Sequence, residues 1–368
     1  MSDRTRAIRL FVTSLASLGL AACSQPPVAV GAVLSGPFLD AVRLALDDAR
    51  AAGGLPALDT VLLPAPTNRA APAISQADTI VRWPGMVAVV GHSNSAASLA
   101  ASPIYNQAGI VQIAPTSTAT RYAEAGPYSF RLVPPDLRQG AFLASAVADL
   151  RPGGARTAVF YVNDDYGRGL RAEFLSQLDT ARYAVVFDVP HSDEEVVNPP
   201  PDRRARVAGV IAAARAVAPE VVLWLGRPTT FEMYLREIRR QLDDVVILGG
   251  DAMGSWNRND TSTVSWAGIR FVDFVDLDGS QALRDFRVRY AARFGVSASA
   301  AEVLSYDAMR LILAAIGDGA RSGADVRDWL LSLGRSRPPF SGLSGPISFT
   351  EEGEVERSYH LTTIPGGQ

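Results

Sequence analysis

The sequence of 368 residues contains no lysine, one cysteine and three histidines, and these shortages exclude several kinds of chemistry. A single cysteine allows no intrachain disulfide, even in an oxidising compartment. His92, His191 and His360 lie too far apart in the sequence for the short spacings of common metal motifs. The 35 basic residues, all arginine, are scattered, and the net charge is only −3, so nothing favours nucleic acid as a partner. No pairing of nucleophile and base is evident, so we expect a protein that is not an enzyme and needs no cofactor.

The first 23 residues are typical of a bacterial export signal. Three arginines precede an apolar segment, residues 10–20, that is too short to span a bilayer comfortably. The segment ends in Leu-Ala-Ala-Cys, which resembles the lipobox of bacterial lipoproteins. That resemblance implies a signal peptide over 1–22, cleavage before Cys23, diacylation of its thiol and a tether over 23–27. We expect an exported, periplasmic protein that is anchored to a membrane through Cys23; the choice between inner and outer membrane stays open.

Apolar runs of strand length alternate with helical patterns along most of the remaining chain. The pattern pauses near residues 133–135 and then begins again, which predicts two similar α/β lobes, each with a parallel, Rossmann-like sheet. We expect lobe I over 28–133 plus 276–339 and lobe II over 134–275 plus 340–368, joined by a hinge of several crossings. Predicted strands are 28–34, 58–63, 86–90, 110–113, 157–162, 184–189, 221–225 and 245–248, with a final hairpin of 346–349 and 355–361. Predicted helices include 71–82, 166–178, 206–217, 231–241, 280–294, 302–316 and 324–333.

Two turns rich in hydroxyl groups follow buried strands of the first lobe. Gly-His-Ser-Asn-Ser ends at Ser95 after the strand 86–90, and Ala-Pro-Thr-Ser-Thr ends at Thr118 after the strand 110–113. In open α/β sheets, ligands bind beyond the carboxyl ends of the strands. Hydroxyls and free backbone N–H groups suit a small carboxylate. Helix capping alone would explain any one of these residues, but the pairing of the two turns favours a binding site.

The segment from Val89 to Tyr122 resembles the type I periplasmic binding proteins, most of all the leucine/isoleucine/valine-binding group. Further motifs in the expected order extend the resemblance to nearly the whole mature chain. These are Leu-Ser-Gly-Pro at 34–37, Ala-Ala-Gly-Gly at 51–54, Tyr-Gly-Arg-Gly at 166–169, Gly-Gly-Asp at 249–251 and Tyr-Asp-Ala at 306–308.

The resemblance implies a ligand site for an amino acid between the lobes. The Ser95 hydroxyl and the Thr118 N–H would hold the α-carboxylate. The Thr118 hydroxyl, the Thr116 carbonyl and the Asp251 carboxylate would hold the α-ammonium, and Tyr166 would cover the ligand on closure. A buried zwitterion needs polar partners at both ends, which agrees with this set. Asp251 could instead be an ordinary turn residue.

One position departs from the pattern of the family. Where relatives often carry an aromatic residue after the strand 221–225, this chain has Arg227. An arginine facing the ligand would disfavour a purely aliphatic side chain and could pair with a carboxylate or an amide. The same side chain could also point to solvent. We therefore expect a branched-chain-type or polar amino acid, or a related small amide, without choosing among them.

The resemblance also implies a role and partners. The protein would be the substrate-binding lipoprotein of an ABC importer and would pass its ligand to a permease and ATPase complex. The alternative is a lipoprotein of the same fold that acts as a ligand sensor or as a partner of a cell-wall synthase.

Overall fold

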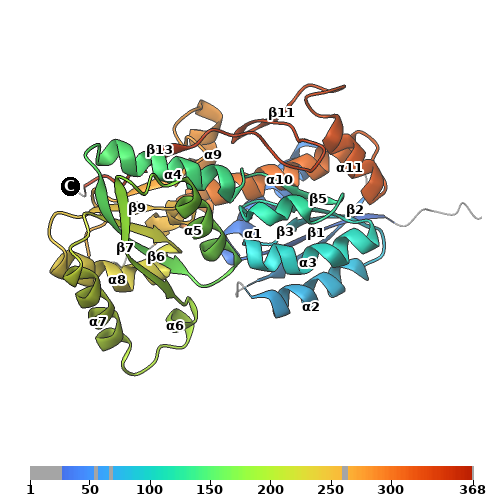
Figure 1. Ribbon diagram of the computed structural model, residues 1–368. Helices are drawn as coiled ribbons and strands as arrows, with labels where there is room; N and C mark the ends of the chain where they lie inside the picture. Colours follow the sequence, from blue (N-terminus) through green and yellow to red (C-terminus); the bar gives the residue numbers. More distant parts are fainter. Residues whose placement is uncertain (1–26, 54–56, 66–68, 259–263, 367–368) are drawn as a thin grey trace, which may run out of the picture.

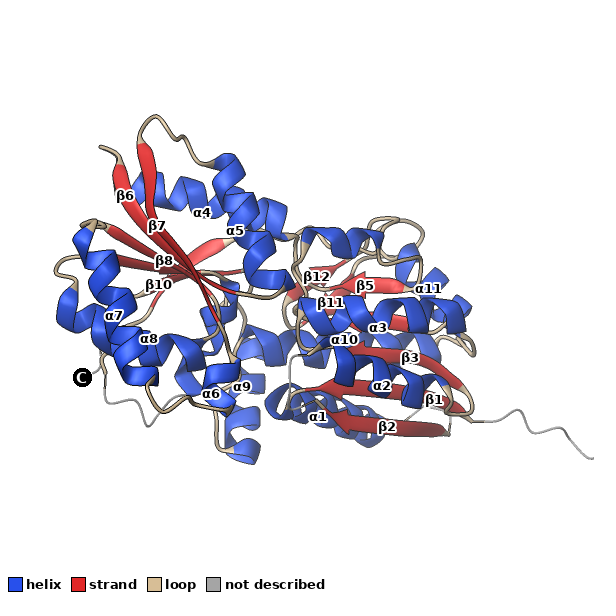
Figure 2. Cartoon of the chain, turned by 60° about the horizontal axis from the view of Figure 1, so that its bottom comes forward, coloured by secondary structure: helices blue, strands red, loops and turns tan. Residues whose placement is uncertain are grey.

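The computed structural model describes residues 27–53, 57–65, 69–258 and 264–366. The predicted signal peptide and Cys23 lie outside these residues. Two sheets form separate layers, each between helices, and the lobes that they define lie side by side (Figure 2). The described chain begins at the outer edge of one lobe and ends at the far side of the other (Figure 1). In the part of the chain that the structure describes, no helix has the combined length and apolarity that crossing a bilayer requires.

The first sheet has five parallel strands in the order β2-β1-β3-β4-β5. Alternate residues of β1 pack on opposite faces: Val30 and Ala32 lie in the core beneath α1 and α10, whereas Ala29 and Val33 contact the side of α2 and α3. Burial on both faces explains why β1 and β3 are continuous apolar runs. The elements are β1 (Val28–Leu34), α1 (Gly36–Ala52), β2 (Leu58–Pro64), α2 (Ala70–Val81), β3 (Met86–Gly91), α3 (Ser95–Ala108), β4 (Val111–Ala114), η1 (Thr120–Glu124) and β5 (Ser129–Arg131).

The second sheet repeats this order and adds one strand. Its order is β13-β10-β9-β8-β6-β7, parallel except for β13, which pairs antiparallel with β10. The cores lie beneath α4 and α5 on one face and beneath α7 and α8 on the other. Its elements are α4 (Asp136–Leu150), β6 (Ala155–Val162), α5 (Asp165–Gln177), β7 (Tyr183–His191), α6 (Glu194–Val197), α7 (Arg203–Ala216), β8 (Val221–Leu225), α8 (Pro228–Gln241), β9 (Val246–Gly249), η2 (Asp251–Arg258), β10 (Arg270–Asp273) and β13 (His360–Thr363).

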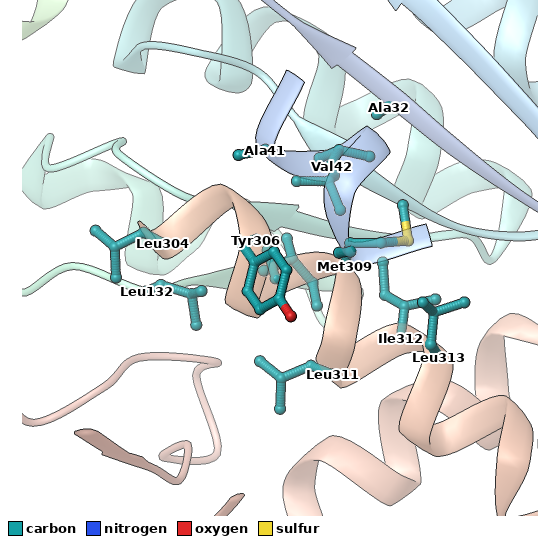
Figure 3. Close-up of a cluster of buried hydrophobic side chains, with 14 of the residues drawn as sticks. Ala32, Ala41, Val42, Leu132, Leu304, Tyr306, Met309, Leu311, Ile312 and Leu313 are labelled. Atoms are coloured by element: carbon teal, nitrogen blue, oxygen red, sulfur yellow. The ribbon is translucent and has the colours of Figure 1, made fainter. Parts of the chain in front are cut away.

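The chain returns to the first lobe after β10. Three helices follow, α9 (Gln281–Phe294), α10 (Ala300–Gly317) and α11 (Gly323–Ser332), and α10 lies against α1 and the first sheet. Figure 3 shows Met309 and Ile312 of α10 beside Val42 of α1, with Ala32 of β1 behind them. A capping box of Ser299 and Glu302 begins α10. The first lobe is therefore completed by sequence that follows nearly all of the second.

The fold class that the sequence predicts, two α/β lobes with parallel sheets, is confirmed. The predicted terminal hairpin is wrong. A two-stranded ribbon forms instead from β11 (Phe340–Gly342) and β12 (Gly345–Ile347), and β13 crosses to the second sheet. Ile347, Phe349 and Val355 pack in the core of the first lobe, so the chain crosses after residue 355 rather than at the expected boundary of 340.

Candidate functional site

A cavity of about 230 Å³ lies between the two lobes and is lined by both. In each sheet the strand order reverses at the first strand, between β1 and β3 and between β6 and β8. A ligand site in this class of sheet lies beyond such a switch point. Ser35 follows β1, residues 93–95 follow β3, and Arg227 follows β8, and all of them line the cavity. The remaining lining residues are Phe38, Thr116, Tyr166, Pro228, Thr229, Asp251, Ala252, Gly254, Ser255, Phe274, Ser299, Ala300 and Ala301.

The two hydroxyl turns of the first lobe are held together by their own hydrogen bonds. Thr116 donates its hydroxyl to the Ser93 carbonyl at 3.0 Å, and the Ser93 hydroxyl accepts the Ser35 N–H at 2.8 Å. Ser95 accepts the Ala119 N–H at 3.1 Å and is almost fully buried. Asn94 caps α3 by accepting the Ala97 N–H at 3.0 Å. The turns predicted from the sequence therefore form one polar wall.

Thr118 differs from the other predicted residues of this wall. It is fully buried and is not among the residues that line the cavity. Its carbonyl accepts the Asp136 N–H at 2.7 Å and an Arg131 N–H at 3.2 Å. Its hydroxyl interacts with the buried carboxyl group of Asp136. Thr118 thus lies behind the polar wall. Its hydrogen bond to Asp136 connects the turn after β4 to the segment at 133–136, where the chain first passes from lobe I to lobe II.

On the second lobe, Asp251 and Tyr166 form the opposite polar group. The Tyr166 hydroxyl donates to Asp251 Oδ1 at 2.8 Å, and both residues line the cavity. Gln139 of α4 holds Asp251 at two points: its Nε2 donates to Oδ1 at 2.9 Å, and its Oε1 accepts the Asp251 N–H at 2.9 Å. Burial raises the pKa of Asp251, although the hydrogen bonds from Gln139 and Tyr166 act in the opposite direction. A carboxylate kept out of water in this way is a natural partner for a cation.

Sequence reasoning missed Gln139 and the carboxyl groups near it. Gln139 is fully buried in the first turn of α4, and the sequence gives no local sign of its contact with residue 251. Asp136 in the same turn is also fully buried, and the Thr118 hydroxyl interacts with its carboxyl group. Burial raises the pKa of Asp136 well above its usual value, and the Asp251 carboxylate raises it further. The pause in the pattern at residues 133–135, where the sequence predicts the boundary between the lobes, was a signal that the residues just after it could lie near the cleft.

Arg227 lines the cavity, but two carboxylates hold its side chain. Its Nη2 donates to Asp164 Oδ2 at 2.9 Å, and its Nη1 donates to Asp193. The side chain is 17% exposed, which answers the question left open by the sequence: it does not point freely into solvent. Asp193 also accepts the Thr230 hydroxyl, and Asp164 caps α5.

Polar contacts also join the two lobes directly. Arg121 of η1 pairs with Asp165 of α5 at 2.7 Å, and the Thr120 hydroxyl donates to Glu173 at 2.9 Å. Arg69, next to α2, pairs with Glu194 of α6. Contacts of this kind stabilise a closed arrangement of two lobes only while the lobes are together.

Among the described residues, no three His, Cys, Asp or Glu side chains gather as the ligands of a metal ion would. The fold resembles that of solved binding proteins. The computed structure matches a leucine-binding protein, LivK, from Thermotoga maritima with a TM-score of 0.78 at 20% identity, covering 92% of this chain and 95% of that one. It matches LivJ from Streptococcus pneumoniae, solved with isoleucine, with a TM-score of 0.76 at 21% identity, covering 92% and 96%.

Sequence comparison leads to the same group. An amino acid binding protein of Pseudomonas aeruginosa is 25% identical over 332 residues, which cover 86% of this chain and 82% of the relative. The sequence profile of a periplasmic binding protein family matches residues 27–368. The chain therefore belongs to the type I periplasmic binding proteins, in the family of the leucine/isoleucine/valine-binding proteins.

Proposed function

We propose that the protein captures an amino acid between its lobes and delivers it to the permease and ATPase of an ABC importer. The observation that carries this proposal is the pairing of unlike polar groups across one cavity. Asp251 and Tyr166 line the second-lobe side, and Ser95 and Thr116 line the first-lobe side. A zwitterion that loses its water needs a negative group for its ammonium and several N–H or O–H donors for its carboxylate.

The six predicted site residues take distinct parts in this proposal. Asp251 holds the ammonium together with the Thr116 carbonyl, and Ser95 at the start of α3 donates to the carboxylate. Tyr166 covers the ligand while it orients Asp251. Thr118, which lies behind the wall, contributes its backbone and shapes the turn. Arg227 contacts the ligand side chain.

Hinge closure supplies the affinity in this scheme. The binding groups come from both lobes, so a ligand makes all of its contacts only when the lobes are together. Binding then shifts the equilibrium between open and closed forms by the difference in affinity between the two.

The choice of an amino acid as the ligand is supported by relatives such as the amino acid binding protein of Pseudomonas aeruginosa.

The test is a thermal-shift screen of the purified protein against amino acids, their amides, ureas and short peptides. A ligand that binds only the folded state raises the melting temperature by mass action. We expect at least one amino acid to stabilise the protein, and Asp251→Ala and Ser95→Ala to abolish the shift. Asp149→Asn and Ser145→Ala, which change exposed residues of α4 far from the cavity lining, serve as matched controls. A folded protein that responds to nothing in the panel would contradict the proposal and favour the role of partner of a cell-wall synthase.

We also propose that the protein is a periplasmic lipoprotein anchored through Cys23. This part rests on the lipobox-like sequence and on Cys23 being the only cysteine. Expression with an alkyne-labelled fatty acid should label the wild-type protein in the membrane fraction. Cys23→Ala should remove both the label and the membrane association. A label that persists in that variant would refute the anchor at Cys23.

A further inference from the structure

The group that faces the ligand from the second-lobe switch point is a guanidinium held between two carboxylates. Arg227 follows β8 and is the N-cap residue of α8, whereas Asp164 follows β6 and caps α5 by accepting the Gly167 N–H at 3.0 Å. Of the described residues in this cluster, Arg227 lines the cavity and neither Asp164 nor Asp193 does. The carboxylates therefore lie behind the guanidinium as seen from the ligand.

The charges of this cluster nearly cancel. Arg227 carries one positive charge against the two negative charges of Asp164 and Asp193. The N-termini of α5 and α8 each add roughly half a positive unit charge at Asp164 and Arg227. His191, which lies near all three residues, adds no charge at neutral pH, because burial lowers its pKa to about 4. An ionic ligand side chain, whether negative or positive, therefore gains little here that would offset its loss of water.

The guanidinium still offers hydrogen-bond donors. It has five N–H groups, and the described contacts show Nη1 donating to Asp193 and Nη2 to Asp164. A purely aliphatic ligand side chain would leave the remaining donors without a partner when the lobes close, which costs free energy. Thr229 and Ser255 add hydroxyl groups to the same cavity, and Phe38 and Phe274 add apolar surface. This lining suits a short apolar stem that ends in a polar, uncharged group.

We propose that Arg227, held between Asp164 and Asp193, makes the cleft selective for an amino acid whose side chain ends in a neutral hydrogen-bond acceptor, such as a carboxamide. This inference rests on the proposed function and narrows its substrate class. Arg227 donates to the carbonyl oxygen of the ligand side chain. Asp164 and Asp193 orient the guanidinium and cancel the charge that would otherwise attract a carboxylate.

The test is isothermal titration calorimetry of the purified protein with L-glutamine, L-leucine and L-glutamate. We expect glutamine to bind at least about tenfold more tightly than either of the others, the effect of one charge-assisted hydrogen bond. Arg227→Met should reduce the preference for glutamine over leucine to less than about threefold. Asp193→Asn keeps the shape and one acceptor oxygen, but it removes one negative charge and the second acceptor, which leaves a guanidinium N–H free for the ligand. It should therefore improve glutamate relative to glutamine by about tenfold. Arg215→Met, at an exposed arginine of α7, is the control and should change nothing.

The possible results distinguish a failure of the selectivity assigned to Arg227 from a failure of the proposed amino-acid capture. Leucine binding as tightly as glutamine, or a ratio of glutamate to glutamine that Asp193→Asn leaves unchanged, would overturn the role of Arg227. If that leucine binding is lost in Asp251→Ala, the proposed amino-acid capture stands and only the selectivity fails. If none of the three amino acids binds the folded wild-type protein, the selectivity is wrong, and silence across the wider thermal-shift panel as well would refute amino-acid capture.

Discussion

Replacing Gly250 by alanine tests whether the polar group of the second lobe is as tightly packed as the structure shows. A Cβ at Gly250 would lie 2.6 Å from the Tyr166 hydroxyl oxygen and 3.2 Å from Gln139 Oε1. Both distances are inside the usual contact of about 3.5 Å, and Tyr166 and Gln139 are both buried. The methyl group must therefore displace the hydroxyl that donates to Asp251 at 2.8 Å.

The expected cost combines crowding with a weakened hydrogen bond. Overpacking of this kind costs about 1–3 kcal/mol, and a hydrogen bond to a charged group contributes about 1.5–3 kcal/mol. Because the two effects overlap, we expect Gly250→Ala to lower the free energy of unfolding by about 2 kcal/mol. This change corresponds to a fall in melting temperature of about 4 °C. Calorimetric melting measures this directly. Ligand affinity should fall as well, since Asp251 loses part of its orientation.

Two further variants make this reasoning refutable. Gly209→Ala lies at an exposed position inside α7 with no atom near the new methyl group, so it should stabilise the protein by about 0.5–1 kcal/mol. Tyr166→Phe removes the oxygen that the new Cβ would meet, so Gly250→Ala should cost at least about 1 kcal/mol less in that background. An equal cost in both backgrounds, or a Gly250→Ala protein as stable as wild type, would show that the packing argument is wrong.

Three other perturbations have defined signs. Burial raises the pKa of Asp273, the last residue of β10, to about 7. Between about pH 4 and 7 the folded state therefore holds a proton that the unfolded state releases. The stability of the protein falls as the pH rises through this range. Asp273→Asn keeps the acceptor and should gain about 1–3 kcal/mol over wild type between pH 4.5 and pH 8 in unfolding experiments. Burial lowers the pKa of His191 to about 4, so its contribution to stability is lost as the pH falls from 6.5; His191→Phe should flatten that decline in acid melts. Arg121→Ala removes an exposed ion pair between the lobes and should weaken ligand binding by less than about fivefold, with no effect at high salt.

Local patterns in the sequence predicted most elements of the fold. The strands at 28–34 and 221–225 have the predicted bounds, because a strand buried on both faces is visible as an unbroken apolar run. The short strands β5 and β10 escaped notice, since three or four residues ending in Arg131 or Asp273 show no clear period. The partner of β13 lies far back in the chain at β10, so no turn signal near residue 360 could reveal it.

The site was predictable to the extent that its residues follow strands. Ser95, Thr116, Arg227 and Asp251 come after strand ends and line the cavity, as the topology requires. The environment of Arg227 was not predictable, because Asp193 and Asp164 are 34 and 63 residues away along the chain. Side-chain contacts over such separations depend on how two helices and two loops pack.

The order of the segments along the chain leaves the first lobe without one of its covering helices until late in the sequence. Helix α10, which packs on the apolar face of the first sheet, follows β6 to β10 in the sequence (Figure 3). A nascent or truncated chain that stops before α10 would carry a complete parallel sheet in the second lobe and a bare hydrophobic surface on the first. Such surfaces attract chaperones and proteases and promote aggregation. Only a chain that extends past residue 317 can bury that surface.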